Sequence, residues 1–280
     1  LSAKAGHGEA WLVPEWNTAP RIHKPPLTAW VNMLGWNDLD PATSSPETLV
    51  ARARVLGAIA AAIGLCGAFL AGWSLGGPAL AWSTLLACGS SLLLIKQARL
   101  ASYDTYLFGF SSVATACGLL ALNRDRATMR WWVACGLSWG FATLAKGPIS
   151  IVFVGIPLAA SLAWIPENRR RNTVGLGVAA LIALALFAPW KIYILLNVPD
   201  AAFRVLQEYR SERDAFQAPW YYLGLIPVLF PWSLAFLCGL RDAWARRWNR
   251  EQRGPALALI WFAAVFLVMS VPGAKQQRYI

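Results

Sequence analysis

The strongest constraint on the fold is a series of long apolar stretches that carry almost no charge. A helix that crosses a bilayer needs about 20 mostly apolar residues. Hydrophobic residues make up 57% of the chain and charged residues 14%, whereas soluble domains carry about 25% charge. We therefore predict an all-α, multi-spanning integral membrane protein with about eight transmembrane helices. The predicted spans are Val55–Trp73, Ala79–Ile95, Asp104–Leu122, Arg130–Ala145, Gly147–Trp164, Thr173–Val198, Pro219–Leu240 and Pro255–Val271.

This pattern divides the chain into two parts. Residues 1–54 are predicted to form an extracytoplasmic loop with juxtamembrane helices. Residues 55–280 are predicted to form a transmembrane helical domain with an extracytoplasmic loop at about 199–218. Because the chain opens at Leu1 without Met or an apolar signal segment, we expect it to be a fragment.

Two smaller features refine this organisation. Gly76-Gly77-Pro78 predicts a tight turn between the first two spans, since glycine permits the turn and proline favours the first position of a helix. Several tryptophans stand at span ends and are expected in the interfacial aromatic belt. They are Trp73, Trp131, Trp132, Trp190 and Trp232.

Positive charge predicts the orientation, because cytoplasmic loops carry the excess of Lys and Arg. Loops 123–130, 166–172 and 241–253 hold 11 Arg and 4 acidic residues and are predicted to be cytoplasmic. The remaining 14 of the 25 basic residues lie outside or at that boundary. Snorkelling at helix ends explains such residues one at a time. A cluster of them also suits a phosphate in the outer leaflet.

Lys24 begins the motif Lys24-Pro25-Pro26-Leu27. The two prolines fix φ, remove two backbone donors and keep the chain extended until a helix starts behind them. Lys24 is therefore predicted to lie in a rigid segment directly before a helix, which is a suitable place to hold an anion.

Asp104 is the one acidic residue between Val55 and Arg124, and it stands at the predicted outer end of a span. It could cap the helix N-terminus. It could also serve glycosyl transfer, in which a carboxylate deprotonates or orients the acceptor while cations neutralise the departing phosphate. The two roles are compatible.

Metal-binding patterns are weak in this chain. The five cysteines stand singly in apolar runs, and there are two histidines. These residues supply neither a disulfide framework nor a metal-ligand spacing. We predict no metal ligands, leave a divalent ion open as a cofactor, and expect membrane lipids but no nucleic acid as partners.

Seven short motifs follow one another in a characteristic order. They are Trp11-Leu12-Val13-Pro14, Lys24-Pro25-Pro26-Leu27, Ala101-Ser102-Tyr103-Asp104, Ala145-Lys146-Gly147-Pro148, Pro219-Trp220-Tyr221-Tyr222-Leu223, Phe230-Pro231-Trp232-Ser233-Leu234 and Lys275-Gln276-Gln277-Arg278-Tyr279-Ile280. In this order the whole chain resembles the bacterial polytopic glycosyltransferases of the GT-C class. These are related to protein O-mannosyltransferases and to the aminoarabinose transferase of lipid A.

The resemblance implies a glycosyltransferase of the bacterial inner membrane that works on the periplasmic side. It would move a sugar from a polyprenyl-phosphate carrier to a lipid, glycan or protein acceptor. The family's leading Asp-Glu motif, its best candidate for the catalytic base, would precede Leu1, so these residues alone are expected to be catalytically incomplete. The resemblance assigns the donor phosphate to Lys24, Lys146, Lys275 and Arg278, the catalytic acidic position to Asp104, and a sugar or acceptor loop to Glu208 and Arg213.

The alternative is a polytopic transporter or flippase-like protein in which the same cations bind a translocated anionic lipid or solute. Transporters usually show paired repeats and helices broken near the middle of the membrane, whereas the charges here gather at one face. A structural scaffold would leave the outward lysines and Asp104 unexplained. The enzyme is therefore the preferred interpretation.

Overall fold

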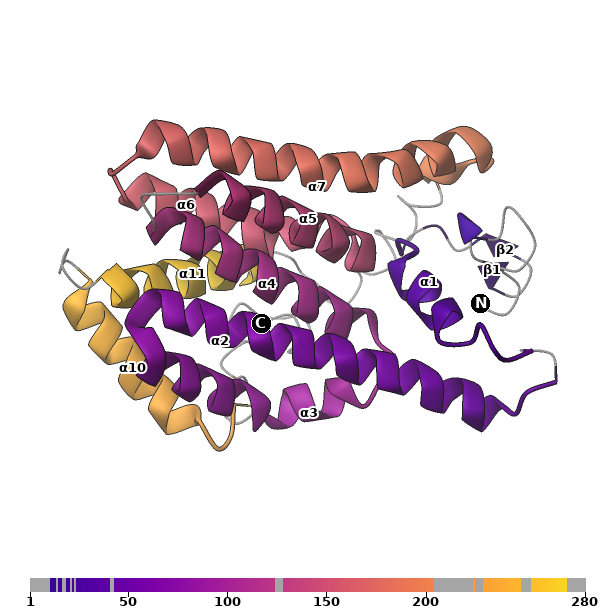
Figure 1. Ribbon diagram of the computed structural model, residues 1–280, viewed down its shortest axis with the longest axis horizontal. Helices are drawn as coiled ribbons and strands as arrows, with labels where there is room; N and C mark the ends of the chain where they lie inside the picture. The colour runs from indigo at the N-terminus through magenta and orange to yellow at the C-terminus, as the bar shows by residue number, and fades with distance from the viewer. Residues whose placement is uncertain are drawn as a thin grey trace.

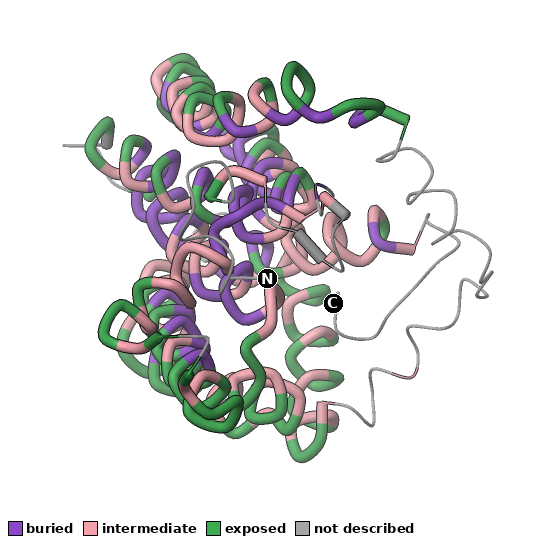
Figure 2. Tube along the Cα trace, turned by 90° about the vertical axis from the view of Figure 1, so that its right-hand side faces the viewer, coloured by how far each residue is buried: buried purple, intermediate pink, exposed green. Residues whose placement is uncertain are grey.

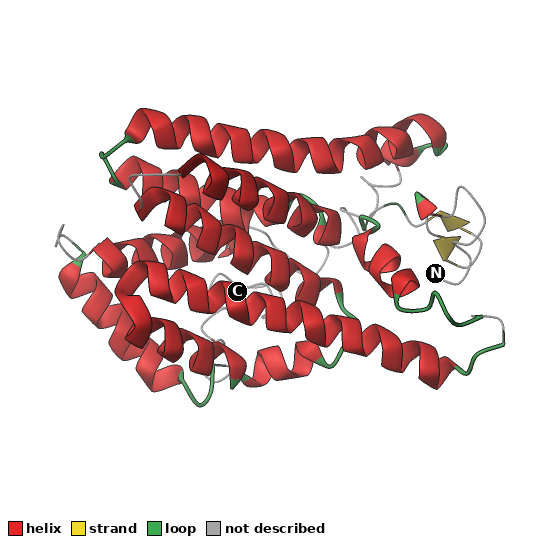
Figure 3. Cartoon of the chain, in the orientation of Figure 1, coloured by secondary structure: helices red, strands yellow, loops and turns green. Residues whose placement is uncertain are grey.

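The computed structural model describes residues 11–270 except 14, 17–18, 21, 23, 41–42, 124–127, 204–223, 225–228 and 248–252. These residues form a bundle of long helices with one pair of very short strands (Figure 1, Figure 3). The antiparallel strands β1 (Glu15–Trp16) and β2 (Ala19–Pro20) and the helix α1 (Leu27–Leu34) gather at one end of the bundle. The bundle itself contains α2 (Pro46–Gly89), α3 (Leu92–Ala98), α4 (Tyr103–Asn123), α5 (Thr128–Lys146), the π-helical turn η3 (Ile151–Gly155), α6 (Ile156–Trp164), α7 (Arg169–Asn197), α10 (Ser233–Arg246) and α11 (Arg253–Ser270).

Helix α2 is a helical hairpin rather than a straight rod (Figure 1). Its backbone leaves helical geometry at Gly76 and at Gly77, where φ is +74°, and the helix resumes at Pro78. Phe69 and Trp82 meet edge to face across the turn with their ring centroids 5.1 Å apart. The two legs therefore run antiparallel, and the predicted Gly-Gly-Pro turn is confirmed.

The helices match the eight predicted spans unevenly. Within the described part of the chain, α2, α4, α7 and α11 are long and apolar enough to cross a membrane by length and composition. Helix α5 covers its predicted span and starts slightly earlier, at Thr128. The fifth predicted span is shorter than expected, because the chain turns at Gly147 and the helical segment Ile151–Trp164 begins only behind that turn.

Two further spans differ from the prediction. The second is interrupted, since α2 ends at Gly89 and α3 starts at Leu92. The seventh is interrupted within its described part: residues 229–232 form a turn, and α10 begins at Ser233, whereas most of the predicted residues before that turn lie outside the described residues. Pro231 explains the turn, because proline has no N–H to donate and disfavours the helical conformation in the residue before it.

Small residues allow α2 and α4 to approach closely. A Cβ on Gly67 would lie 2.6 Å from backbone atoms of Ser112 and Val113, and a Cβ on Gly109 would lie 2.6 Å from the carbonyl oxygen of Ala60. Lipid tails are as apolar as leucine, so helices in a bilayer associate through close packing rather than through the hydrophobic effect. These glycines are therefore part of what holds the first helices together.

The largest core cluster lies between α4, α5, α6, α7 and α11. Leu119, Trp132 and Leu158 are fully buried there, and Figure 2 shows buried positions gathered between the helices. Many large apolar side chains point outward instead, such as Leu181 and Leu196 of α7, which are 66% and 79% exposed. Extensive exposed apolar surface on long apolar helices is typical of a lipid-facing exterior.

The predicted aromatic belt is wrong for two tryptophans. Trp132 has no exposed surface and fills the space opposite Gly175 of α7, where any larger residue would overlap its ring. Trp190 is also buried and donates its Nε1–H to the carbonyl oxygen of Leu12 at 2.9 Å. Both indoles serve packing between segments, whereas Trp73 remains half exposed near the α2 turn.

Neighbouring helices alternate in direction, as predicted. Asn123 at the end of α4 donates its Nδ2–H to the carbonyl oxygen of Ser74 at 2.9 Å, beside the α2 turn. Arg253 at the start of α11 pairs with Glu167 at 2.6 Å, between α6 and α7. These four residues line one cavity, so the loops predicted to be cytoplasmic meet at one end of the bundle. Helix α1 lies at the other end (Figure 1).

Replacing Gly67 with valine is expected to lower the midpoint of thermal unfolding in detergent. The new side chain would meet backbone atoms of α4, and overpacking of this kind costs about 1–3 kcal/mol. Gly177→Val is the matched control, because no atom lies within 4 Å of a Cβ built at that exposed position of α7. Equal midpoints for the two variants would contradict the close packing of α2 and α4.

Candidate active site

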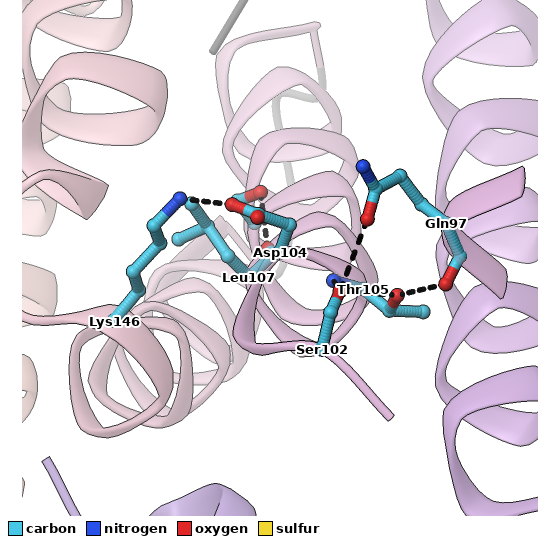
Figure 4. A network of polar contacts seen from close by, with 7 residues as sticks. Gln97, Ser102, Asp104, Thr105, Leu107 and Lys146 are labelled. Carbon is cyan, nitrogen blue, oxygen red and sulfur yellow. Dashed lines mark hydrogen bonds and ion pairs between the residues drawn. The ribbon is translucent and has the colours of Figure 1, made fainter. Parts of the chain in front are cut away.

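Asp104 and Lys146 form an ion pair between neighbouring helices (Figure 4). Asp104 lies in the first turn of α4, and Lys146 is the last residue of α5. The pair joins Lys146 Nζ to Asp104 Oδ1, and 7% of the lysine side chain and 12% of the aspartate side chain are exposed. A charge this deeply buried is costly without a partner. The structure thus joins two residues that the sequence assigned to separate roles.

Ser102, and not Asp104, caps α4. Ser102 Oγ accepts a hydrogen bond from the N–H of Thr105 at 3.4 Å, as an N-cap serine does. Thr105 Oγ1 donates to the carbonyl oxygen of Gln97 at 2.9 Å, which ties the cap to α3 (Figure 4). Ser102 is therefore the N-cap residue, and Asp104 lies in the first turn behind it. The sequence signal for Ser102, a serine just before an apolar helix, was missed.

The Lys-Gly-Pro motif ends α5 in a defined way. The N–H of Gly147 donates to the carbonyl oxygen of Thr143 at 2.7 Å, and its φ of +85° is a conformation that glycine adopts without strain. Pro148 then prevents the helix from continuing. Lys146 consequently stands at the negative end of the α5 dipole and Asp104 at the positive end of the α4 dipole, so both charges are stabilised where they lie.

The Lys-Pro-Pro segment lies against this same end of α5. Pro25 and Pro26 are buried, and a Cβ on Gly147 would lie 3.9 Å from Cγ of Pro25. Leu27 packs in one cluster with residues of α4 and α5. Lys24 is partly exposed, and none of the described carboxylates pairs with it. The segments that carry Lys24 and Lys146 are thus side by side, as their shared predicted role requires.

Two cavities meet at Asp104. The first, of about 460 Å³, lies between α2, α4 and α11, and the second, of about 560 Å³, lies between α2, α3, α4 and α10. Thr84, Cys88 and Phe108 also line both, and most of the other lining residues are apolar. Volumes of this size suit small-molecule ligands. The arrangement offers an apolar enclosure that ends at a carboxylate with a lysine beside it.

The remaining predicted site residues cannot be placed in this arrangement, because they lie outside the described residues. They are Lys275, Arg278, Glu208 and Arg213. In the part of the chain that is described, no group of three or more His, Cys, Asp or Glu side chains could hold a metal ion.

Comparison with known proteins identifies the family of the chain. The family model described as dolichyl-phosphate-mannose-protein mannosyltransferase matches residues 23–193, a range that includes Lys24, Asp104 and Lys146. The chain belongs to this mannosyltransferase family. The relationship predicted from the seven motifs is confirmed, and the family favours the enzyme over the transporter.

Curated relatives within this mannosyltransferase family have a common name. The undecaprenyl phosphate-alpha-4-amino-4-deoxy-L-arabinose arabinosyl transferase of Pseudomonas savastanoi pv. phaseolicola is 22% identical over 289 residues, which cover 100% of this chain and 52% of that protein. The transferase of the same name, number 1, of Pseudomonas fluorescens is 26% identical over 159 residues, which cover 53% of this chain and 28% of that protein. The chain spans about half the length of these relatives or less.

Solved structures show the same fold. ArnT from Cupriavidus metallidurans bound to undecaprenyl phosphate matches with a TM-score of 0.82 and 22% identity, over 99% of this chain and 51% of that protein. An oligosaccharyltransferase of Archaeoglobus fulgidus, in a complex with Zn and sulfate, matches with a TM-score of 0.62 and 15% identity, over 99% of this chain and 41% of that protein. The predicted all-α, multi-pass GT-C fold is confirmed.

Breaking the Asp104–Lys146 pair from one side is expected to destabilise the protein more than removing both charges. Asp104→Asn or Lys146→Met leaves one nearly buried charge without this partner, a change that costs about 3–5 kcal/mol in fully buried pairs. The double variant should recover part of the loss in unfolding midpoint. The exposed pair Arg52–Asp38, whose atoms lie 3.0 Å apart, is the control and should show coupling of at most about 1 kcal/mol. Strictly additive losses at 104 and 146 would contradict an energetically coupled pair.

Proposed function

We propose that the complete protein transfers a sugar from a polyprenyl-phosphate carrier to a lipid, glycan or protein acceptor. The observation that carries this proposal is the Asp104–Lys146 pair, which lies beside the Lys-Pro-Pro segment and whose aspartate lines two largely apolar cavities. A structure of the same fold, ArnT, is described as bound to undecaprenyl phosphate, and this likeness supports a donor of the same chemistry.

The donor needs cations more than it needs a proton. When the bond between the anomeric carbon and the phosphate oxygen breaks, its electron pair goes to a phosphate that is anionic at neutral pH. Lys24 and Lys146, whose segments lie side by side, are proposed to receive that charge, with Lys275 and Arg278 as the further predicted ligands. Charge-assisted hydrogen bonds from lysine or arginine to phosphate are among the strongest in proteins. The polyprenyl chain would lie in the apolar cavities.

The acceptor needs a carboxylate. Its hydroxyl oxygen forms the new bond to the anomeric carbon, and its proton must pass to a base. Asp104, which pairs with Lys146, is proposed to orient the acceptor or receive the proton. Glu208 and Arg213 are proposed to belong to the loop that contacts the sugar or the acceptor. General acid–base assistance of this kind is worth about 10²–10⁴ in rate.

The site is proposed to face the periplasm from the bacterial inner membrane. The Arg-rich loops meet at the opposite end of the bundle from Lys24 and Lys146, and Arg-rich loops stay on the cytoplasmic side. A transporter is not favoured, because it would need its anion site near the middle of the membrane. The Asp104–Lys146 pair lies instead at the ends of α4 and α5.

In the full-length protein, Lys24→Ala is expected to lower sugar transfer from a polyprenyl-phosphate donor by about 10–150-fold, the value of one charge-assisted contact. Asp104→Asn should lower it by about 10²–10⁴. Lys191→Ala is the matched control for the loss of one charge and should keep its activity. Lys191 lies near the C-terminal end of α7. The unfolding midpoint is measured for each variant. Full activity of both Lys24→Ala and Asp104→Asn would reject the proposed site. The same assay with and without EDTA tests whether sugar transfer requires the divalent ion that the sequence leaves open.

The orientation can be tested with single cysteines in a background without the five native ones. Cysteines at Arg170 and Arg247 are expected to be shielded from a membrane-impermeant thiol reagent in intact cells. A cysteine at Leu34, which is 66% exposed on α1, should be labelled. The reverse pattern would place the site in the cytoplasm and would exclude the periplasmic proposal.

A further inference from the structure

We propose that a second site, a surface groove formed by Arg54, Lys96 and Arg99, binds the phosphate headgroup of an anionic membrane lipid. The groove has a volume of about 410 Å³. Its other lining residues are all leucine or isoleucine, and every residue that lines it is exposed: Arg54, Leu92, Ile95, Lys96, Arg99 and Leu100. These six residues are called the basic groove below.

Close packing of two helices builds the groove. A Cβ on Gly57 would lie 2.9 Å from the carbonyl oxygen of Leu100, so α2 runs directly against the segment that follows α3. Arg54 lies about one helical turn before Gly57, which brings it beside that segment. Lys96 stands in the last turn of α3, and Arg99 is its C-terminal cap. Three cations, one from α2 and two from the end of α3, are thereby held around one hollow.

The charge of the groove is not neutralised from within the protein. Arg52, two residues before Arg54 on α2, pairs with Asp38 at 3.0 Å. By contrast, no carboxylate of the described residues pairs with Arg54, Lys96 or Arg99. Holding three like charges together without a counter-ion is unfavourable, so the groove is complementary to an anion. A phosphate accepts hydrogen bonds from several such groups at once.

The apolar residues decide in favour of a lipid over a free anion. Leu92 is 58% exposed, Ile95 44% and Leu100 41%, and they lie beside the cations in the same hollow. Lysine and arginine near a membrane surface, next to apolar side chains, are the arrangement that binds anionic headgroups. Acyl chains of a phospholipid would cover the leucines and the isoleucine while its phosphate contacts the cations.

The groove is distinct from the site at Asp104, although a single helix, α3, lies between the two. Leu93, Leu94 and Gln97 of α3 line the second Asp104 cavity. Leu92, Ile95 and Lys96 line the groove, and on a helix with 3.6 residues per turn these two sets point to opposite faces. A lipid in the groove would therefore contact the outer side of a wall of the Asp104 cavity.

The test measures binding of phosphatidylglycerol to the full-length protein in detergent by native mass spectrometry. The variant Arg54→Gln/Lys96→Gln/Arg99→Gln should bind it roughly a hundredfold more weakly, at about fivefold for each cation. The matched control is Arg130→Gln/Arg170→Gln/Arg241→Gln, which removes the same charge from the opposite end and should bind as the wild type does. If the triple variant unfolds, the single variant Lys96→Gln should still bind about fivefold more weakly.

Four results would overturn the proposal. Unchanged binding in the groove variants would remove these residues from the site. An equal loss in the control would show that phosphatidylglycerol responds to total charge. If the wild-type protein bound inorganic phosphate as tightly as phosphatidylglycerol, the ligand would not be a lipid. If it bound phosphatidylcholine as tightly as phosphatidylglycerol, the ligand would not need to be anionic. Sugar transfer is not part of the measurement, so the outcome is independent of the proposed enzyme activity.

Discussion

Close contact between helix backbones is the constraint on which this structure depends. In lipid, burying a leucine between two helices gains little over leaving it in the acyl chains, so helices hold together where their surfaces fit at short range. Gly67 and Gly109 give that fit between α2 and α4, and Gly57 gives it between α2 and the end of α3. Both functional regions follow from these contacts, since the Asp104 cavities and the basic groove are bounded by helices placed in this way.

Helix ends account for the chemistry of the candidate site. An antiparallel pair brings the start of α4 beside the end of α5, and each end already favours the charge found on it. Ser102 caps α4, the Asp104 carboxylate pairs with Lys146, and Gly147 ends α5 at that lysine next to Pro25. The Lys-Gly-Pro and Lys-Pro-Pro motifs are thus explained by local geometry as well as by family membership.

The sequence predicted the helical class, the α2 turn and the end of the bundle at which Asp104 and Lys146 lie, because these depend on composition and on local rules. It did not predict that Asp104 and Lys146 pair. That pairing needed the inference that α4 and α5, joined by a short loop, must run antiparallel with their far ends together. The buried positions of Trp132 and Trp190 were also missed, since burial depends on which glycine or segment lies opposite. Two predicted spans are interrupted where a local signal was available, at Gly147-Pro148 and at Pro231.

The α2 hairpin has a consequence for how the protein enters the membrane. From Val55 to Ile95 there is no charged residue, and the turn itself consists of Gly76, Gly77 and Pro78. A pair of spans without charge at its turn contains no signal of its own for which way to insert, because topology is set by the Lys and Arg of the flanking loops. During biogenesis the first two passes are therefore expected to insert together as one unit, with their orientation fixed by the arginines that follow α4 and α6.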